Sequence, residues 1–161
     1  MVAAIGDAVT RSDNIGLTGT LKPKEEATGG FAETGVSGKH FNGGTILTVA
    51  PNGAPTDPRG KAPAEILLPP DADTKAHVHP SGQIGRTTGD AGTLVVGDSQ
   101  NSSFVQTPSP RDIENALPYG TNIVVGGAGE DRTVYFYARS GNQSGCNCIA
   151  KMSWSNFLKL K

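Results

Sequence analysis

Short apolar runs bounded by glycine, proline and asparagine recur along the chain, a pattern typical of β-strands joined by turns. Residues 45–49 (TILTV) end at a Pro-Asn-Gly turn, and residues 75–79 (KAHVH) alternate polar and apolar positions up to Pro80. Residues 122–125 and 133–137 are rich in β-branched and aromatic side chains and flank a glycine-rich turn. We expect these last two runs to be paired central strands of a sheet.

Helical signals are few and short. Ser109 is followed by proline at the first helical position and by Asp112 at the third, which predicts a short helix that Pro118 stops. Residues 154–161 are expected to close the core as a short amphipathic helix or strand. The elements therefore indicate a sheet with few helices.

The chain of 161 residues is long enough for one core but short for two independent domains. We predict a weakly structured lead-in at residues 1–24, with a short helix around residues 7–11, and a single domain at residues 25–161. Residues 81–108 are rich in glycine, threonine, serine and asparagine. Two β-like runs there predict an inserted hairpin: residues 93–96 and 103–106.

Composition narrows the function classes. The 22 glycines and 11 prolines predict many turns and long loops. With 14 basic and 15 acidic residues, the chain has no charge excess that favours nucleic acid or an anionic membrane surface. No apolar run is long enough to span a bilayer, and the N-terminus lacks the pattern of a signal peptide. We therefore expect no nucleic-acid partner and no membrane span.

The two cysteines, Cys146 and Cys148, are separated by one residue. A pair this close is strained as a disulfide, so we expect no disulfide framework and a structural or incidental role for both thiols. Cys146 as a thiol nucleophile, in a Ser-Gly-Cys segment like those of some cell-wall transpeptidases, is a minor alternative.

The most concentrated chemical signal is the pair His77 and His79, because imidazoles two residues apart on a strand project to one side and can share a metal ion. The alternative is a pair of solvent-facing histidines beside a proline turn.

A second signal is Ser109-x-x-Asp112, where the carboxylate can be a third zinc ligand. The same pattern is a helix capping box, and the two roles are compatible. A third is Glu26, which precedes Gly29-Gly30 and can take a proton from a metal-bound water.

In this order, Glu26…His77-Val-His79-Pro80…Ser109-Pro-Arg-Asp112 resembles the E…H-x-H-P…S-x-x-D motif of the JAMM (JAB/MPN) zinc metallopeptidases. The details look most like the JAB-like domains of bacterial Rhs-type and other secreted polymorphic toxins. The resemblance covers roughly residues 25–139.

The resemblance implies an α+β fold, a mixed and mostly antiparallel sheet flanked by short helices, with the cytidine-deaminase-like architecture of JAMM domains. It implies Zn²⁺ held by His77, His79 and Asp112 with water as fourth ligand. It further implies Glu26 as general base and Ser109 as stabiliser of the oxyanion. The bond cleaved would be an amide or isopeptide of a peptide or protein.

The same resemblance implies a secreted or delivered bacterial effector or toxin, with an immunity protein as partner if it is antibacterial. A catalytically silent JAMM-like module of a larger secreted or phage-tail assembly is the alternative function.

Two points depart from the family pattern. Residues 81–108 lengthen the interval between the second histidine and the serine, so Asp112 reaches the metal only if this insertion folds out. The identity of the general base is also open, because Glu25, Glu33 and Glu65 are alternatives to Glu26.

Other zinc and nucleophile chemistries fit less well. Zinc nucleobase deaminases need H-x-E and C-x-x-C, whereas this chain has H-x-H and C-x-C. H-E-x-x-H, a phosphate-binding G-x-x-x-x-G-K-[ST] loop and a G-x-S-x-G nucleophile elbow are absent from the sequence.

Overall fold

The fold is taken from a computed structural model of the chain. It describes residues 1–19, 21–22, 25–60, 62–88, 93–95, 103–139 and 148–160.

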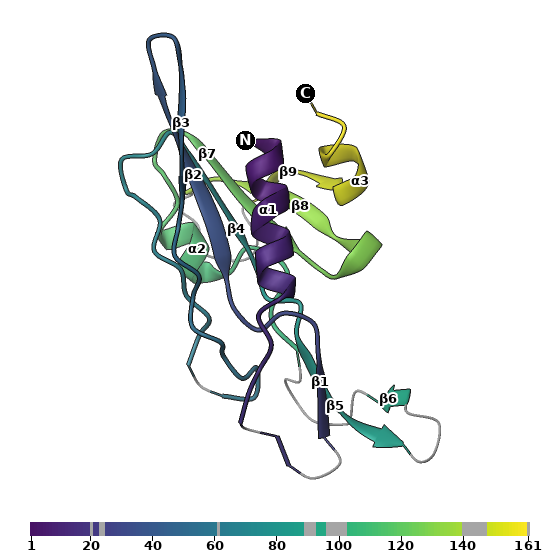
Figure 1. Cartoon of the computed structure of the whole chain (residues 1–161). Helices are drawn as coiled ribbons and strands as arrows, with labels where there is room; N and C mark the ends of the chain where they lie inside the picture. Colours follow the sequence, from purple (N-terminus) through teal and green to yellow (C-terminus); the bar gives the residue numbers. More distant parts are fainter. Residues whose placement is uncertain are drawn as a thin grey trace.

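A six-stranded open sheet with the order β3-β2-β4-β7-β8-β9 forms the centre of the molecule (Figure 1). Its strands are β2 (Thr34–Phe41), β3 (Gly44–Val49), β4 (Thr74–Val78), β7 (Thr121–Gly126), β8 (Thr133–Tyr137) and β9 (Cys148–Ser153). All neighbouring strands are antiparallel except β4 and β7, which run parallel. The expected α+β class, with a mixed and mostly antiparallel sheet, is confirmed.

The four strands expected from the apolar runs are all present. They correspond to β3, β4, β7 and β8, and the predicted pairing of β7 with β8 is confirmed. These predictions hold because each run combines β-branched or aromatic residues with clear turn residues at its end.

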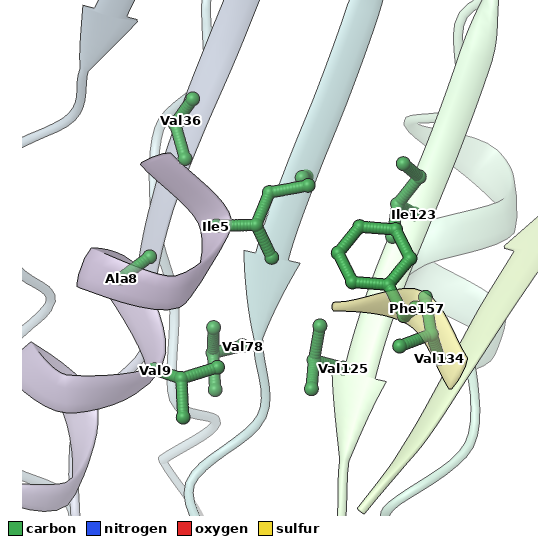
Figure 2. Packing of buried hydrophobic residues seen from close by; sticks show 10 residues of the cluster. Ile5, Ala8, Val9, Val36, Val78, Ile123, Val125, Val134 and Phe157 are labelled. Carbon is green, nitrogen blue, oxygen red and sulfur yellow. The ribbon is translucent and has the colours of Figure 1, made fainter. Parts of the chain in front are cut away.

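Helix α1 (Val2–Asp13) covers one face of the sheet (Figure 1). Its buried residues Ile5, Ala8 and Val9 lie at the i, i+3, i+4 spacing of one helix face, and they pack in a core that includes Val36 and Val125 (Figure 2). The helix expected around residues 7–11 is thus present but longer, and the N-terminal segment is not a weakly structured lead-in. Its three buried side chains are interrupted by Gly6 and Asp7, which hid the amphipathic pattern in the sequence.

Helix α3 (Trp154–Phe157) confirms the expectation of a C-terminal element that closes the core. Phe157 is 2% exposed and joins the same cluster as Ile5, beside Ile123 and Val134 (Figure 2). The side chain of Ser153 caps this helix by accepting a hydrogen bond from the Asn156 amide.

The other face of the sheet carries helix α2 (Pro110–Glu114). A second, smaller cluster lies there, in which Ile113 and Ala116 pack against Val124 of β7 and Tyr137 of β8. Because side chains alternate along a strand, Val124 faces α2 while Val125 faces α1. The helix predicted to start at Ser109 is confirmed.

A second, three-stranded sheet with the order β1-β5-β6 lies beyond one end of the main sheet (Figure 1). Its strands are β1 (Glu25–Thr28), β5 (Gln83–Thr88) and β6 (Thr93–Val95). The insertion does fold out, but not as the hairpin predicted for residues 93–96 and 103–106. β6, which matches the first of these runs, pairs with β5 instead, and among the described residues Ser103 forms an isolated bridge with Gln83. β5 was missed because its sequence, QIGRTT, contains a single large apolar residue.

Cys148, at the start of β9, is disulfide-bonded, which corrects the expectation that no disulfide forms. The other cysteine, Cys146, lies outside the described residues, as does the suggestion that it is a nucleophile. Within the described part of the chain, no helix has the length and apolar character needed to cross a membrane.

Candidate metal centre

His77 lies on β4 and His79 lies one residue beyond its end, and both side chains are on the face of the sheet that carries α2. His77 pairs with Gly35 of β2 on one side and with Val124 of β7 on the other. The parallel alignment with β7 continues past the end of β4, because the His79 amide donates to the Val125 carbonyl at 2.9 Å. Side chains two residues apart on a strand share a face, so both imidazoles point to the same side. They are 5% and 4% exposed, which excludes a solvent-facing pair.

Asp112 approaches both histidines from α2. Its Oδ1 lies 3.0 Å from His77 Nε2, and its Oδ2 lies 3.2 Å from His79 Nε2. The capping box holds this carboxylate in place: the Ser109 amide donates to Asp112 Oδ2 at 2.6 Å, and the Asp112 amide donates to Ser109 Oγ at 3.2 Å. The helix cap and the approach to the histidines are therefore compatible uses of one aspartate, as expected.

The backbone settles the tautomer of His79. Its Nδ1 lies 2.9 Å from the Val105 carbonyl oxygen, which can only accept a hydrogen bond, so Nδ1 carries the hydrogen. In the neutral ring, Nε2 then presents a lone pair. That lone pair faces His77 Nε2 at 3.1 Å and the Asp112 carboxylate, which is an acceptor. A cation between these atoms would satisfy all of them.

The spacing of the donor atoms fits a tetrahedral metal ion. Ligand atoms bound tetrahedrally to one zinc at about 2.0–2.1 Å lie about 3.3 Å from one another. The two histidine Nε2 atoms lie 3.1 Å apart, and each approaches a different oxygen of Asp112: His77 Nε2 lies 3.0 Å from Oδ1 and His79 Nε2 lies 3.2 Å from Oδ2. The hydrogen bond from His79 Nδ1 to a backbone carbonyl is also the usual support of a metal-binding histidine. The residues present therefore fit zinc.

Glu33 is the second carboxylate at this centre. It precedes β2, and extending the antiparallel pairing of Thr34 with Val78 by one residue places Glu33 opposite His79. A carboxylate oxygen of Glu33 and one nitrogen from each of His77 and His79 all lie within 4.8 Å of one another. Both carboxylates therefore lie beside the histidines, and Glu33, His77 and His79 by themselves form a group that could hold a metal ion.

Burial and the neighbouring charges both shift the pKa values of the ionisable groups at the centre. Burial raises the pKa of Glu33, and this outweighs the opposing attraction of the two histidines. Burial also raises the pKa of Asp112, but the hydrogen bonds and charges of His77 and His79, in their protonated forms without a metal, outweigh it and hold that pKa far below its ordinary value. For His77, burial lowers the pKa, whereas the hydrogen bond and charge of Asp112 raise it, and the net direction is up. The two carboxylates therefore have pKa values moved in opposite directions, which favours different roles.

A cavity of about 690 Å³ opens over the centre. Glu33, His77, Asp112 and Ser109 line it from below, and the segment of residues 63–68 forms a wall. Gly35, opposite His77, lets this wall pack close to β2: a Cβ there would lie 2.8 Å from the Ala76 carbonyl oxygen and within 3.2 Å of the Ile66 and Leu68 side chains. The metal centre is therefore accessible to a ligand.

Gln106 fixes the return of the chain from the small sheet to α2. Its amide nitrogen donates to the Pro80 carbonyl at 3.1 Å, and its amide oxygen accepts from the Gly127 amide at 2.6 Å. The chain passes so close to β7 that a Cβ at Gly126 would lie 1.8 Å from the Gln106 carbonyl oxygen. This crossing places the neighbouring Val105 carbonyl against His79 and leads directly to Ser109.

The structure thus brings together His77, His79, Asp112 and Ser109, but not Glu26. Glu26 lies on β1, opposite Gly85 in the small sheet, with an exposed side chain. The glutamate beside the histidines is Glu33, one of the alternatives. Glu25 is paired with Arg59 away from this cavity, and Glu65 lines the cavity but is paired with Arg111.

Sequence reasoning missed Val105, Lys75 and Tyr137. The Val105 contribution is a backbone carbonyl, which no side-chain motif records. Lys75 and Tyr137 line the cavity because their strands present alternate positions to the α2 face. That alternation was readable for Lys75, since it lies two residues before His77.

Comparison with known proteins gives no relative: no family model, curated protein or solved structure matches the chain.

Proposed function

We propose that this chain is a zinc-dependent metallopeptidase or amidase that hydrolyses an amide or isopeptide bond. The observation that carries the proposal is the convergence of His77 Nε2, His79 Nε2 and the Asp112 carboxylate at 3.0 to 3.2 Å beneath an open cavity. Three protein ligands with a further position open to water or substrate is the arrangement of hydrolytic zinc sites.

His77, His79 and Asp112 would hold the metal. When bound, zinc supplies Lewis acidity, which lowers the pKa of a coordinated water to about 7 and polarises a carbonyl group. The hydrogen bond from His79 Nδ1 to the Val105 carbonyl leaves a lone pair on Nε2 of the neutral ring, and a metal ligand requires such a lone pair.

Glu33 is the general base in this proposal and replaces Glu26. Its carboxylate lies close enough to the histidines to receive a proton from the attacking water as the new carbon–oxygen bond forms. It then passes that proton to the nitrogen of the breaking carbon–nitrogen bond, so an amine leaves. The raised pKa of Glu33, caused by burial, suits a group that both accepts and donates a proton near neutral pH.

Ser109 is placed to stabilise the oxyanion. Its Oγ accepts a hydrogen bond from the Asp112 amide, and that bond does not use the hydroxyl hydrogen. Because Ser109 lines the cavity, this hydrogen can be donated to the substrate carbonyl oxygen as negative charge develops there.

The resemblance to the JAMM motif supports the same reaction, since its histidines, serine and aspartate are the residues that converge here. It is also the sole basis for proposing a secreted bacterial effector or toxin with an immunity protein as partner. A catalytically silent module with the same ligand set is the competing function, and only activity distinguishes the two.

The test compares the zinc-loaded chain with Glu33→Gln and Glu26→Gln on a panel of peptide, isopeptide and peptidoglycan cross-link substrates. We expect Glu33→Gln to retain zinc and lose about 10²–10⁴-fold in kcat/KM, the contribution usual for a general base. Glu26→Gln is the matched control and should keep both zinc and activity. Activity retained by Glu33→Gln would refute its role, and a zinc-loaded chain inactive on the whole panel would favour the silent module.

A further inference from the structure

Two cations line the cavity over the metal centre, and they differ in their partners. Arg111 is ion-paired with Glu65 at the rim. Lys75 lines the same cavity, and no carboxylate of the described residues pairs with its ammonium group. Lys75 is therefore the cavity cation whose charge is left uncompensated within the described part of the chain.

The position of Lys75 on β4 explains why it has no partner. Its neighbours across the sheet are Ser37 on β2 and Asn122 on β7, both uncharged. Asn122 is itself committed, because its side chain accepts from the Leu117 amide at 2.8 Å. The Lys75 ammonium thus has no acid opposite it on either neighbouring strand.

The lysine also lies near His77 on the same strand. It lies two residues before His77 and therefore on the same face of β4. Its side chain is partly buried and lines the same cavity as His77. A partly buried and unpaired ammonium is unfavourable by itself, and an anionic ligand would relieve that cost.

The charge balance of the cavity favours such a ligand once a metal is present. Three carboxylates line it, Glu33, Glu65 and Asp112, against the two cations. A divalent ion held by the histidines and Asp112 would turn the net charge of the lining positive. The lining then attracts a substrate that carries negative charge.

We propose that Lys75 forms an anion subsite beside the metal, so that the preferred substrate is an amide that carries a carboxylate close to the scissile bond. This inference rests on the proposed function, because it places the carboxylate relative to a metal-bound amide. The carboxylate comes either from the chain terminus or from an acidic side chain of the substrate. Both sources present the same two oxygens to the ammonium.

The experiment uses zinc-binding hydroxamates as probes, so that no cleavable substrate need be known. Alkyl hydroxamates that end in a carboxylate are compared with uncharged alkyl hydroxamates of the same length, over a series of chain lengths. Dissociation constants are measured by calorimetry on the zinc-loaded chain and on Lys75→Met, Lys75→Arg and Lys151→Met. Methionine keeps the apolar stem, arginine keeps the charge, and Lys151 is an exposed lysine on β9 outside the cavity.

We expect at least one carboxylate probe to bind the native chain about tenfold tighter than its uncharged counterpart. Lys75→Met should abolish this advantage while binding of the uncharged probes stays the same, and Lys75→Arg and Lys151→Met should retain it. N-acetyl dipeptides with a free terminus, or with an amidated terminus and a glutamate side chain, then distinguish the two sources of carboxylate by the same loss in Lys75→Met.

An advantage that persists in Lys75→Met, or no advantage at any length in the native chain, overturns the subsite while uncharged hydroxamates still bind zinc. If neither kind of probe binds and the chain holds no zinc, the proposed function fails and the subsite fails with it. The two failures therefore give different results.

Discussion

Ser109 makes two hydrogen bonds that serve both the helix and the metal centre. Its hydroxyl oxygen caps α2, and its amide holds the same Asp112 oxygen that faces His79. Removing the hydroxyl in Ser109→Ala should cost about 1 kcal/mol in the free energy of unfolding, measured by urea titration. It should also weaken zinc binding about tenfold or more, measured with a competing chelator, because the hydroxyl that anchors the Asp112 backbone amide is lost.

Ser153 provides the matched control for this prediction. It caps α3 in the same way, through a hydrogen bond from the Asn156 amide, but lies away from the metal centre. Ser153→Ala should lose comparable stability and keep full zinc affinity. Equal effects of the two variants on zinc binding would show that Ser109 acts only as a helix cap.

The metal-free chain should be most stable in mildly acidic solution. The raised pKa values of His77 and Glu33 give stability that is present at low pH and lost as pH rises through them. The lowered pKa of Asp112 gives stability that is present above about pH 4 and lost as pH falls. The free energy of unfolding should therefore decrease from about pH 5.5 toward pH 8 and toward pH 3.

Zinc should reverse the alkaline side of this profile, since metal ligands bind in their deprotonated forms. Urea titrations at several pH values, with and without zinc, measure both effects. His77→Asn should flatten the decrease above pH 6, whereas His40→Asn, at an exposed position on β2, should not. A metal-free chain whose stability rises steadily from pH 5.5 to pH 8 would contradict the coupling described here.

Among the elements, α1 shows how much of the core lies outside the region that resembles the family motif. Ile5 is 0% exposed and packs in the main cluster between α1 and the sheet. Ile5→Ala should cost about 2–4 kcal/mol in the free energy of unfolding, because a cavity remains where the side chain was. Asp7→Ala, on the exposed side of the same helix, should change stability by less than about 0.5 kcal/mol.

If Ile5→Ala and Asp7→Ala proved equally mild, α1 would be peripheral and the domain would begin near residue 25 after all. Circular dichroism at each urea concentration follows the unfolding of both variants. The comparison isolates burial, because both changes leave alanine in one helix.

The elements that were predictable are those in which local sequence and tertiary packing agree. Strand β8 consists of β-branched and aromatic residues throughout, β7 contains the run Ile-Val-Val, and α2 carries its own cap and proline. β1 and β5 were not predictable, because their pairing joins residues far apart in the chain and neither has a strong apolar pattern. The order of strands in the main sheet depends on the same long-range contacts.

The residues of the candidate site also differ in whether local sequence could identify them. His77, His79, Ser109 and Asp112 were found because each lies in a short motif whose spacing has a physical meaning. Glu33 could not be preferred over Glu26, because its role depends on the register of β2 against β4. That register is set by packing on both faces of the sheet and not by any residue next to the glutamate.

At the scale of the whole molecule, the small sheet takes up part of the long segment between the histidines and the aspartate. Residues that intervene form β5, which pairs with β1, and β6, which pairs with β5, beyond the end of the main sheet (Figure 1). The chain then crosses β7 at Gln106 and starts α2 against the histidines. The inserted residues therefore do not prevent Asp112 from reaching His77 and His79.

The central claim is that His77, His79 and Asp112 hold one zinc ion, and elemental analysis of the purified chain tests it most directly. We predict about one zinc per chain, lost in His77→Ala and in Asp112→Ala and retained in His40→Ala, the variant of the exposed third histidine. Circular dichroism confirms that each variant is folded. Zinc absent from the native chain, or retained in Asp112→Ala, would contradict the account and reduce Ser109 and Asp112 to a helix cap.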